Sequence, residues 1–465
     1  MPNTLASPNA PASLDLQSFL DGRRMSGLQW RVVVLCFLIV AIDGIDIGLA
    51  AYIAPAVRRE WGLSVAELSP IFVSALLGMM AGSLLFGPLA DRRGRRFVLL
   101  ASVATFGLAT LATLFATNVT ELSILRFIAG AGIGGASPAS VTLTAEYASG
   151  KRKLSIITLM MCGNSMGSAF GGVVASQIIE RHGWHAMVLV GGVLPLLLLP
   201  VLWMALPESM RFLALRRPHE QNRLRALGRQ IAPDVVTSQT TFVARETKQS
   251  RSPVRELMVA PYARGTLLLW AAFFMGLSVL YLMASWLPTI ITNSGGSMRN
   301  AALITALWSI GGTTGGLLLG RVMDSARPAW VLGAAYAVAF VTVICIGRAF
   351  GNAAVLAPLV YIAGVCISGT QVGLNGLAAT YYPTANRATG VAWATGIGRF
   401  GSILGSSLGG VLLGSGMAYP VLFLIVGVPA LLAALCMFAM PASRREPASA
   451  VASAPALTPG NPGTR

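Results

Sequence analysis

The sequence predicts an all-α membrane protein of twelve transmembrane helices, arranged as two pseudo-symmetric six-helix halves. Of its 465 residues, 55% are hydrophobic and only 11% are charged, whereas an ordinary soluble domain carries about 25% charged residues. Apolar runs of about twenty residues recur along the whole chain, each long enough to cross a hydrocarbon core of about 30 Å. Short motifs also recur between the two parts of the chain, which indicates an internal duplication.

The apolar runs divide the chain into five regions. An amino-terminal tail, residues 1–30, lacks the basic end, apolar core and small-residue cleavage site of a signal peptide. Residues 31–206 form the first half and residues 265–440 the second. A basic linker at 207–264 joins them, and a Pro/Ala/Ser-rich tail at 441–465 is expected to be disordered. The predicted spans are 31–56, 66–90, 96–116, 121–145, 154–178, 185–206, 265–291, 301–322, 328–350, 354–378, 388–414 and 418–440.

Two pairs of segments support the division into halves. Gly87-Pro-Leu-Ala-Asp91 ends the second span, and Gly320-Arg-Val-Met-Asp324 ends the eighth, 233 residues later. The segment from Tyr147 to Arg152 follows the fourth span, and that from Tyr382 to Arg387 follows the tenth, 235 residues later. Duplicated halves are typical of secondary transporters, whose substrate binds near the middle of the membrane between the repeats.

The net charge of +17 is a topology signal and does not indicate a nucleic-acid partner. Of the 34 Lys and Arg residues, 27 lie in the two tails, the linker and the loops on the same side, and five lie in the opposite loops. Arg126 and Arg399 are the two inside spans. Because basic residues concentrate on the cytoplasmic side of membrane proteins, both termini are expected to be cytoplasmic.

The cysteines and histidines are not arranged as a metal or cofactor site. All five cysteines fall in apolar spans without a CxxC pair, which is typical of small buried side chains. Two of the three histidines are in an outer loop and the third is in the linker. The sequence therefore predicts no disulfide, no metal and no cofactor.

Loop motifs identify the superfamily that the chain resembles. The segment Gly87-Pro-Leu-Ala-Asp91-Arg92-Arg93-Gly94-Arg95-Arg96 resembles a loop signature of the major facilitator superfamily, and Gly320–Pro328 is a degraded copy. Further matches are Arg126-Phe-Ile-Ala-Gly130-Ala-Gly132-Ile-Gly134 and Pro207-Glu208-Ser209-Met-Arg211. This superfamily is itself a standard example of duplicated six-helix halves, so the resemblance implies the major facilitator fold.

Within that superfamily the chain resembles the aromatic acid:proton symporters, which include bacterial hydroxybenzoate and protocatechuate carriers. The matching segments are Leu14–Phe19, Trp30–Phe37, Asp43–Asp46, Ala388–Trp393 and Gly398–Gly401. The resemblance implies a transporter, not an enzyme, that imports a small aromatic carboxylic acid with protons across a bacterial inner membrane. Its partners would be a small organic anion, protons and the lipid bilayer, and it would function as a monomer.

Two other functions stay open. The motifs also suit another organic acid, such as cis,cis-muconate, a phenylpropionate or a chlorinated phenoxyacetate. Ala329 stands where hydroxybenzoate carriers have a histidine, so the exact acid is not assigned. A drug/proton antiporter is disfavoured because the fifth span lacks the proline of the antiporter motif.

Asp43 and Asp46 are the candidate proton-coupling residues. They interrupt the apolar run from Val32 to Ala56, where a carboxylate at mid-membrane costs about 2.5–3.5 kcal/mol. Three residues apart on a helix, they share a face. Two buried carboxylates so close together do not readily both ionise, so one can hold a proton near neutral pH. A structural pair around Gly44 is the alternative.

Two arginines inside spans are candidate substrate ligands. Arg399 is expected near mid-membrane, where its guanidinium could bind a carboxylate in a bidentate geometry or pair with Asp43 or Asp46. Its pseudo-symmetric position is Asn164, so the charge is not a relic of the duplication. Arg126 is nearer the outer end of its span, from which it could reach water, and could join the substrate or proton relay.

Aromatic and amide side chains in the second half could shape a pocket for a flat ring, although packing is the alternative for each. The residues assigned to the substrate site are Trp286, Gln371 and Asn375, and further candidates are Tyr281, Trp308 and Trp393.

Charged residues at the inner ends of the spans are the candidate gate. Carboxylates and arginines there could latch one half to the other and so bias alternation between two states. Glu146, at the end of the fourth span, could join this network. The gating set is Gly87, Asp91, Arg92, Gly94, Arg95, Glu146 and Asp324.

Overall fold

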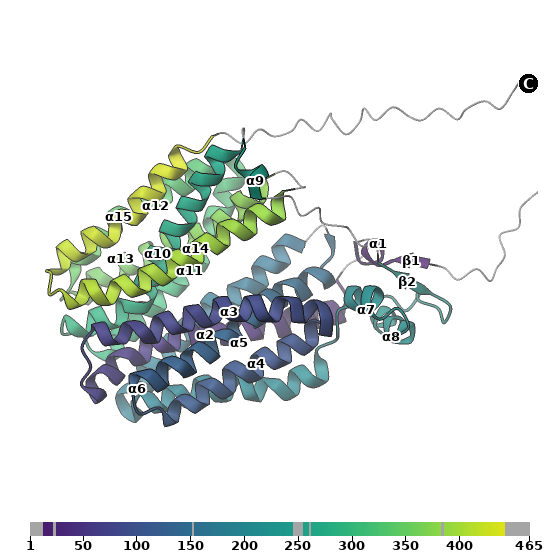
Figure 1. Ribbon diagram of the computed structural model, residues 1–465, viewed down its shortest axis with the longest axis horizontal. Helices are drawn as coiled ribbons and strands as arrows, with labels where there is room; N and C mark the ends of the chain where they lie inside the picture. The colour runs from purple at the N-terminus through teal and green to yellow at the C-terminus, as the bar shows by residue number, and fades with distance from the viewer. Residues whose placement is uncertain are drawn as a thin grey trace, which may run out of the picture.

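The computed structural model describes residues 13–21, 25–150, 153–244, 254–259, 262–382 and 386–441. The carboxyl-terminal tail that is expected to be disordered lies, from residue 442 onward, outside the described residues. The described chain is almost wholly helical, and its long helices form two bundles that lie side by side (Figure 1). The predicted fold class is confirmed.

The first bundle is built from residues of the amino-terminal half. Its helices are α2 (Gly27–Trp61), α3 (Ser69–Arg93), α4 (Arg95–Ala112), α5 (Val119–Tyr147) and α6 (Lys153–Ala205), with short 3-10 helices at Ala66–Leu68 and Thr113–Phe115. Polar caps start these helices where the hydropathy predicts loops: Ser26 forms a capping box with Gln29 on α2, and Asn118 caps α5.

The second bundle is built in the same way from the carboxyl-terminal half. Its helices are α10 (Ala263–Asn293), α11 (Met298–Ser325), α12 (Pro328–Ala349), α13 (Ala353–Tyr381), α14 (Arg387–Gly414) and α15 (Tyr419–Phe438). Proline stands in the first turn of α12 and α15, where its missing N–H costs nothing.

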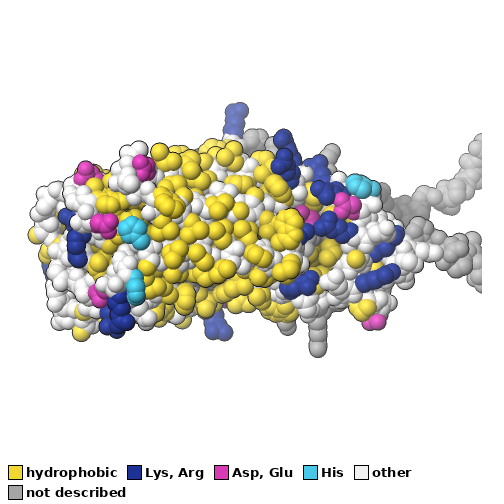
Figure 2. Space-filling model, turned by 90° about the horizontal axis from the view of Figure 1, so that it is seen from below, with side chains coloured by type: hydrophobic (Ala, Val, Ile, Leu, Met, Phe, Trp, Pro, Cys, Tyr) yellow, Lys and Arg dark blue, Asp and Glu magenta, His cyan; other side chains and the backbone are white. Residues whose placement is uncertain are grey.

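Eleven described helices are long and apolar enough to cross a membrane. One of them, α6, has 53 residues, which is about 80 Å of helix and more than twice the thickness of a hydrocarbon core. Gly183 interrupts it with a non-helical backbone (φ 75°, ψ 174°), so α6 consists of two helices joined at a kink. Counting these two parts separately gives the twelve spans of the prediction. A broad apolar band crosses the middle of the surface, with charged side chains toward both ends (Figure 2).

The linker folds against the amino-terminal segment. The linker contains α7 (Met210–Arg216), α8 (Gln221–Ile231), β2 (Thr241–Val243) and α9 (Val254–Leu257). Ahead of α2 lie β1 (Ser13–Asp15) and α1 (Leu16–Asp21), and β1 pairs in parallel with β2. We call the end of the bundles that carries α7 and α8 the linker end, and the opposite end the far end (Figure 1).

The apolar core shows how the two halves meet. One cluster joins both halves through side chains such as Ile53, Phe72, Trp286 and Trp308. The rings of Phe72 and Trp286 cross this boundary with centroids 5.0 Å apart. Toward the linker end the core divides into separate clusters, each built mainly from one half. The halves are therefore packed together at the far end and have separate cores at the linker end.

Two polar contacts also join the halves at the far end. Arg58 donates to the Asn293 side chain at 2.5 Å, and the Arg299 N–H donates to Glu180 at 3.0 Å. Residues 58, 293 and 299 lie at or next to helix termini of the far end. This arrangement closes the far side of the molecule.

Candidate functional site

A buried ion pair between Asp46 and Arg126 is the centre of the site. The Arg126 Nη1 lies 3.4 Å from each carboxylate oxygen of Asp46, and the two side chains are 1% and 4% exposed. Thr110 donates its hydroxyl to Asp46 at 2.7 Å and accepts from Arg126 at 3.0 Å. Arg126 also donates to Thr113 at 3.3 Å. Three helices, α2, α4 and α5, and the 3-10 helix that follows α4 thus supply one hydrogen-bonded cluster.

The expectation that Arg126 reaches water is wrong. The arginine lies in the third turn of α5 and is buried against α2 and α4, because an acidic and two hydroxyl partners are within reach there. Burial without those partners would be costly for a guanidinium, and with them the charge is compensated.

Close helix packing sets the position of the acidic motif. Gly44, between the two aspartates, lies against α6, where an added Cβ would be 2.0 Å from the backbone oxygen of Asn164. On α5, an added Cβ at Gly130 would lie 2.2 Å from the Ala75 backbone oxygen of α3. Only glycine permits these approaches, which pack α2 tightly against α6 and α5 tightly against α3.

Asp43 has different surroundings from Asp46. It is fully buried, and one carboxylate oxygen accepts a hydrogen bond of 3.1 Å from the Ser137 hydroxyl of α5. Its other oxygen has no hydrogen-bond partner among the described residues. The motif therefore places one carboxylate on a cation and the other on a hydroxyl.

A small cavity opens beside the ion pair, between the two halves. Its volume is about 40 Å³, and Asp46 and Arg126 form part of its wall. Apolar side chains of α2, α3 and α5 line most of it, and α10 of the other half contributes Tyr281 and Ser285. An apolar cavity that accepts benzene measures about 150 Å³, so this cavity would have to enlarge before it could hold an aromatic ring.

The other predicted substrate residues lie outside the walls of this cavity. Arg399 is half-buried in α14, and its side chain makes no hydrogen bond or ion pair with a described residue. Asn164 is half-buried, and its backbone oxygen faces Gly44. Trp286 is fully buried in the far-end core, where its indole N–H donates to the Ser406 carbonyl at 2.8 Å.

The two amides of α13 differ in exposure. Asn375 is exposed and donates to the Gln371 carbonyl at 3.0 Å. Gln371 is half-buried, and its side-chain oxygen has no hydrogen-bond partner in the described part of the chain. The structure does not bring either amide to the Asp46–Arg126 pair.

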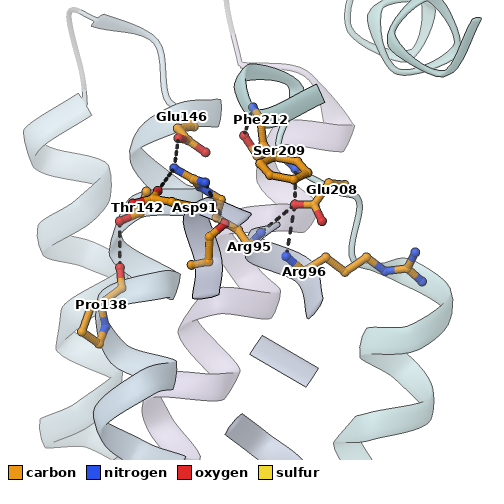
Figure 3. Close-up of polar contacts among 10 residues, drawn as sticks. Asp91, Arg95, Arg96, Pro138, Thr142, Glu146, Glu208, Ser209 and Phe212 are labelled. Carbon is orange, nitrogen blue, oxygen red and sulfur yellow. Dashed lines mark hydrogen bonds and ion pairs between the residues drawn. The ribbon is translucent and has the colours of Figure 1, made fainter. Parts of the chain in front are cut away.

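At the linker end, part of the predicted gating set forms a network within the first half. Arg95 lies 3.0 Å from Asp91 and 3.4 Å from Glu146, and so joins α3, α4 and α5 (Figure 3). Gly87, Arg92 and Asp324 are exposed and are not members of this network. In this conformation the described network stays inside one half, and the predicted latch to the other half stays a prediction.

Sequence reasoning assigned no role to Glu208. Its carboxylate accepts from the backbone N–H groups of Arg95 at 2.9 Å and Arg96 at 3.1 Å, the first two residues of α4 (Figure 3). An acid at a helix N-terminus satisfies orphan N–H groups and complements the helix dipole. Gly94 makes room for it, with φ 102° and an added Cβ only 2.2 Å from Glu208 Oε2. The motif Pro207-Glu208-Ser209 was a signal of this contact, but its partner lies 112 residues away.

Two duplicated helical halves with a buried ion pair between transmembrane helices define the class of secondary transporters. The chain belongs to the Major Facilitator Superfamily, whose family model matches residues 36–406 and 301–459. It is therefore a multi-pass membrane transporter and not an enzyme.

Relatives of known name show members of the superfamily to which the chain is similar in sequence. The 4-hydroxybenzoate transporter PcaK of Pseudomonas aeruginosa is 44% identical, over 92% of this chain and 96% of the relative. The gallate transporter of Pseudomonas putida is 42% identical, over 94% of this chain and 97% of the relative. Among solved structures, the inward open conformation of the xylose transporter XylE from E. coli matches with a TM-score of 0.70. It is 20% identical, over 90% of this chain and 98% of that one, and this likeness concerns the fold alone.

Proposed function

We propose that this protein imports a small aromatic carboxylic acid together with protons across a bacterial inner membrane. The observation that carries the proposal is the Asp46–Arg126 pair in the wall of a cavity between the halves. Relatives named as 4-hydroxybenzoate and gallate transporters, at 44% and 42% identity, support the choice of substrate class. Both termini and the linker would face the cytoplasm, and the transporter would act as a monomer.

Competition for Arg126 explains how proton and acid could be coupled. A guanidinium binds a carboxylate most strongly when two parallel hydrogen bonds form. Here the carboxylate of Asp46 already occupies Arg126. A proton on Asp46 removes that competitor, and the carboxylate of the acid then takes its place. Proton and substrate therefore bind together, because each raises the affinity for the other.

Alternation between two arrangements would complete the cycle. The shared far-end core closes one side, whereas the cores of the halves are separate at the linker end. With the linker in the cytoplasm, this is an inward-facing arrangement. Rocking of one half against the other would separate Phe72 from Trp286 and open the cavity to the outside.

Uptake into proteoliposomes tests the proposal. We would measure accumulation of labelled 4-hydroxybenzoate, gallate, benzoate and cis,cis-muconate with and without an inwardly directed proton gradient. The expected result is gradient-dependent accumulation of one or more aromatic acids. Accumulation that ignores the gradient would remove the symport mechanism, and preference for muconate would move the protein to another acid.

A second comparison separates the two candidate cations. Arg126→Lys keeps the charge and removes the bidentate geometry, so we expect a large increase in KM. Arg399→Lys is the matched variant on α14. If only Arg399→Lys weakens binding, the carboxylate binds to the half-buried arginine of the second half, as the sequence alone suggested.

A further inference from the structure

The two aspartates of the motif face different parts of the first half. Asp46 lines the cavity, whereas Asp43 does not. Asp43 is fully buried against α5, and its Oδ1 has no hydrogen-bond partner in the described chain. A proton on Asp43 therefore needs a route that does not start in the cavity.

Polar side chains follow Asp43 along α2 at two-turn intervals. Gln29, Cys36 and Asp43 are seven residues apart, so they form one stripe on the helix. All three side chains are buried, with exposures of 1%, 0% and 0%. The stripe runs from the middle of α2 to its first turn, at the linker end.

The facing surface of α5 carries hydroxyl groups in matching order. Ser137 donates to Asp43, and the thiol of Cys36 lies beside the hydroxyls of Ser140 and Thr144. Ser140 and Thr144 are 0% exposed, and apart from the neighbouring Cys36 thiol neither hydroxyl has a hydrogen-bond partner among the described residues. In a helix such a hydroxyl ordinarily donates to the carbonyl one turn earlier.

Neighbouring polar groups of α2 and α5 are hydrogen-bonded. On the opposite side of α5, Thr142 donates to the Pro138 carbonyl at 2.9 Å. Closer to the linker end, Gln29 donates to the Tyr147 carbonyl at 2.7 Å and accepts from the Ser26 N–H at 2.8 Å. Polar groups therefore continue from Asp43 to the linker end of the seam between α2 and α5.

We propose that Ser137, Ser140 and Thr144, here called the hydroxyl file, conduct protons between Asp43 and the linker end. The inference rests on the proposed proton coupling and adds a route to it. Residues three or four apart on a helix lie about 5–6 Å from each other, so one water between neighbouring hydroxyls completes the chain. Buried waters bind polar groups that lack other partners.

The transfer conserves charge along the file. Each hydroxyl or water accepts a proton on its oxygen and releases its own proton to the next group. The net result is that Asp43 becomes a carboxylate and one proton reaches water at the linker end. In this scheme the proton that binds Asp46 together with the acid passes to Asp43, three residues earlier on the same face of α2. Asp43 then releases it through the hydroxyl file, so the proton does not leave through the substrate cavity.

The test combines two transport measurements on full-length protein in proteoliposomes. The double variant Ser140→Ala/Thr144→Val removes both hydroxyls with little change in volume. We expect its gradient-driven initial uptake of labelled 4-hydroxybenzoate to fall at least about tenfold, as when a positioned proton-transfer group is lost. Counterflow, in which internal unlabelled acid exchanges for labelled acid, needs no net proton release. It should stay within about twofold of wild type by the same reasoning.

Two controls separate proton conduction from packing. Thr144→Ser keeps the hydroxyl and should keep gradient-driven uptake. Ser102→Ala on α4 removes another fully buried hydroxyl that has no partner in the described chain, and should also keep it. Undiminished gradient-driven uptake by the double variant overturns the hydroxyl file and leaves symport standing. An equal loss of counterflow, or the same loss in Ser102→Ala, also overturns it. If wild type itself shows no gradient-driven uptake, the proposed function fails.

Discussion

The buried ion pair leads to a quantitative prediction for Asp46→Asn. Arg126 Nη1 lies 3.4 Å from both Asp46 oxygens, deep in the protein. At an effective dielectric constant of about 20, unit charges at this distance attract by about 5 kcal/mol. The variant keeps the shape of the side chain but leaves Arg126 with uncharged acceptors only. We therefore expect the protein without substrate to lose about 3–5 kcal/mol of stabilisation.

Binding of an aromatic acid should restore part of the lost stability of Asp46→Asn. In Asp46→Asn its carboxylate would no longer compete with Asp46 for Arg126, so binding should be tighter than in wild type. At a hundred times Kd, a ligand contributes about 2.7 kcal/mol to the folded state. The assay is thermal unfolding in detergent, followed by the fluorescence of the nine tryptophans, with and without 4-hydroxybenzoate.

Asp43→Asn is the matched control, because the Asp43 carboxylate meets a hydroxyl and no cation in the described structure. It should destabilise less and keep the ligand shift of wild type. Two results would refute the reasoning. One is wild-type stability of Asp46→Asn, and the other is a smaller ligand shift in that variant than in wild type.

Three further predictions concern the linker end and the far end. Gly94→Ala should destabilise the protein by about 2–3 kcal/mol in thermal unfolding, because φ is 102° and the Cβ meets Glu208; Gly87→Ala, with open space around it, should not. Glu208→Gln should lose about 1–3 kcal/mol in the same assay, since its bonds to α4 are charge-assisted; wild-type stability would contradict the capping role. Gly410→Leu should prevent far-end closure, because even a Cβ would lie 1.9 Å from Ser69 Oγ. Transport should then fall, and a cysteine introduced in the cavity should be alkylated faster by a reagent added from outside. An unchanged rate of alkylation would contradict this prediction.

The sequence predicted the helices and halves well because the signal of a span is local: it depends on the length and the residue composition of that span alone. Apolar runs, polar caps such as Ser26 and Asn118, and the basic linker are local features. The family motifs then predicted the superfamily, which the family model confirms. Spans five and six were separated correctly at the polar segment around Gly183, where α6 is kinked.

The partners of the charged residues could not be predicted in the same way. Whether Arg126 faces lipid, water or Asp46 depends on the rotation of α5 about its axis. That rotation is set by contacts such as Gly130 against Ala75, between helices far apart in sequence. The attachment of Glu208 to α4 has the same origin. Helical spacing placed the two aspartates on one face and could not show that they have different neighbours.

The parallel pairing of β1 with β2 bears on how the protein is made. Ser13 pairs with Thr241, 228 residues later, so the strand that leaves the ribosome first waits for one that follows the whole first half. Closing so long a loop is entropically costly, and helices already inserted in the membrane reduce that cost by bringing the ends together. Once the strands pair, the two ends of the first half are joined to each other at the linker end. We therefore expect the first half to finish folding before the second half is synthesised, with the pairing of β1 and β2 as its last step.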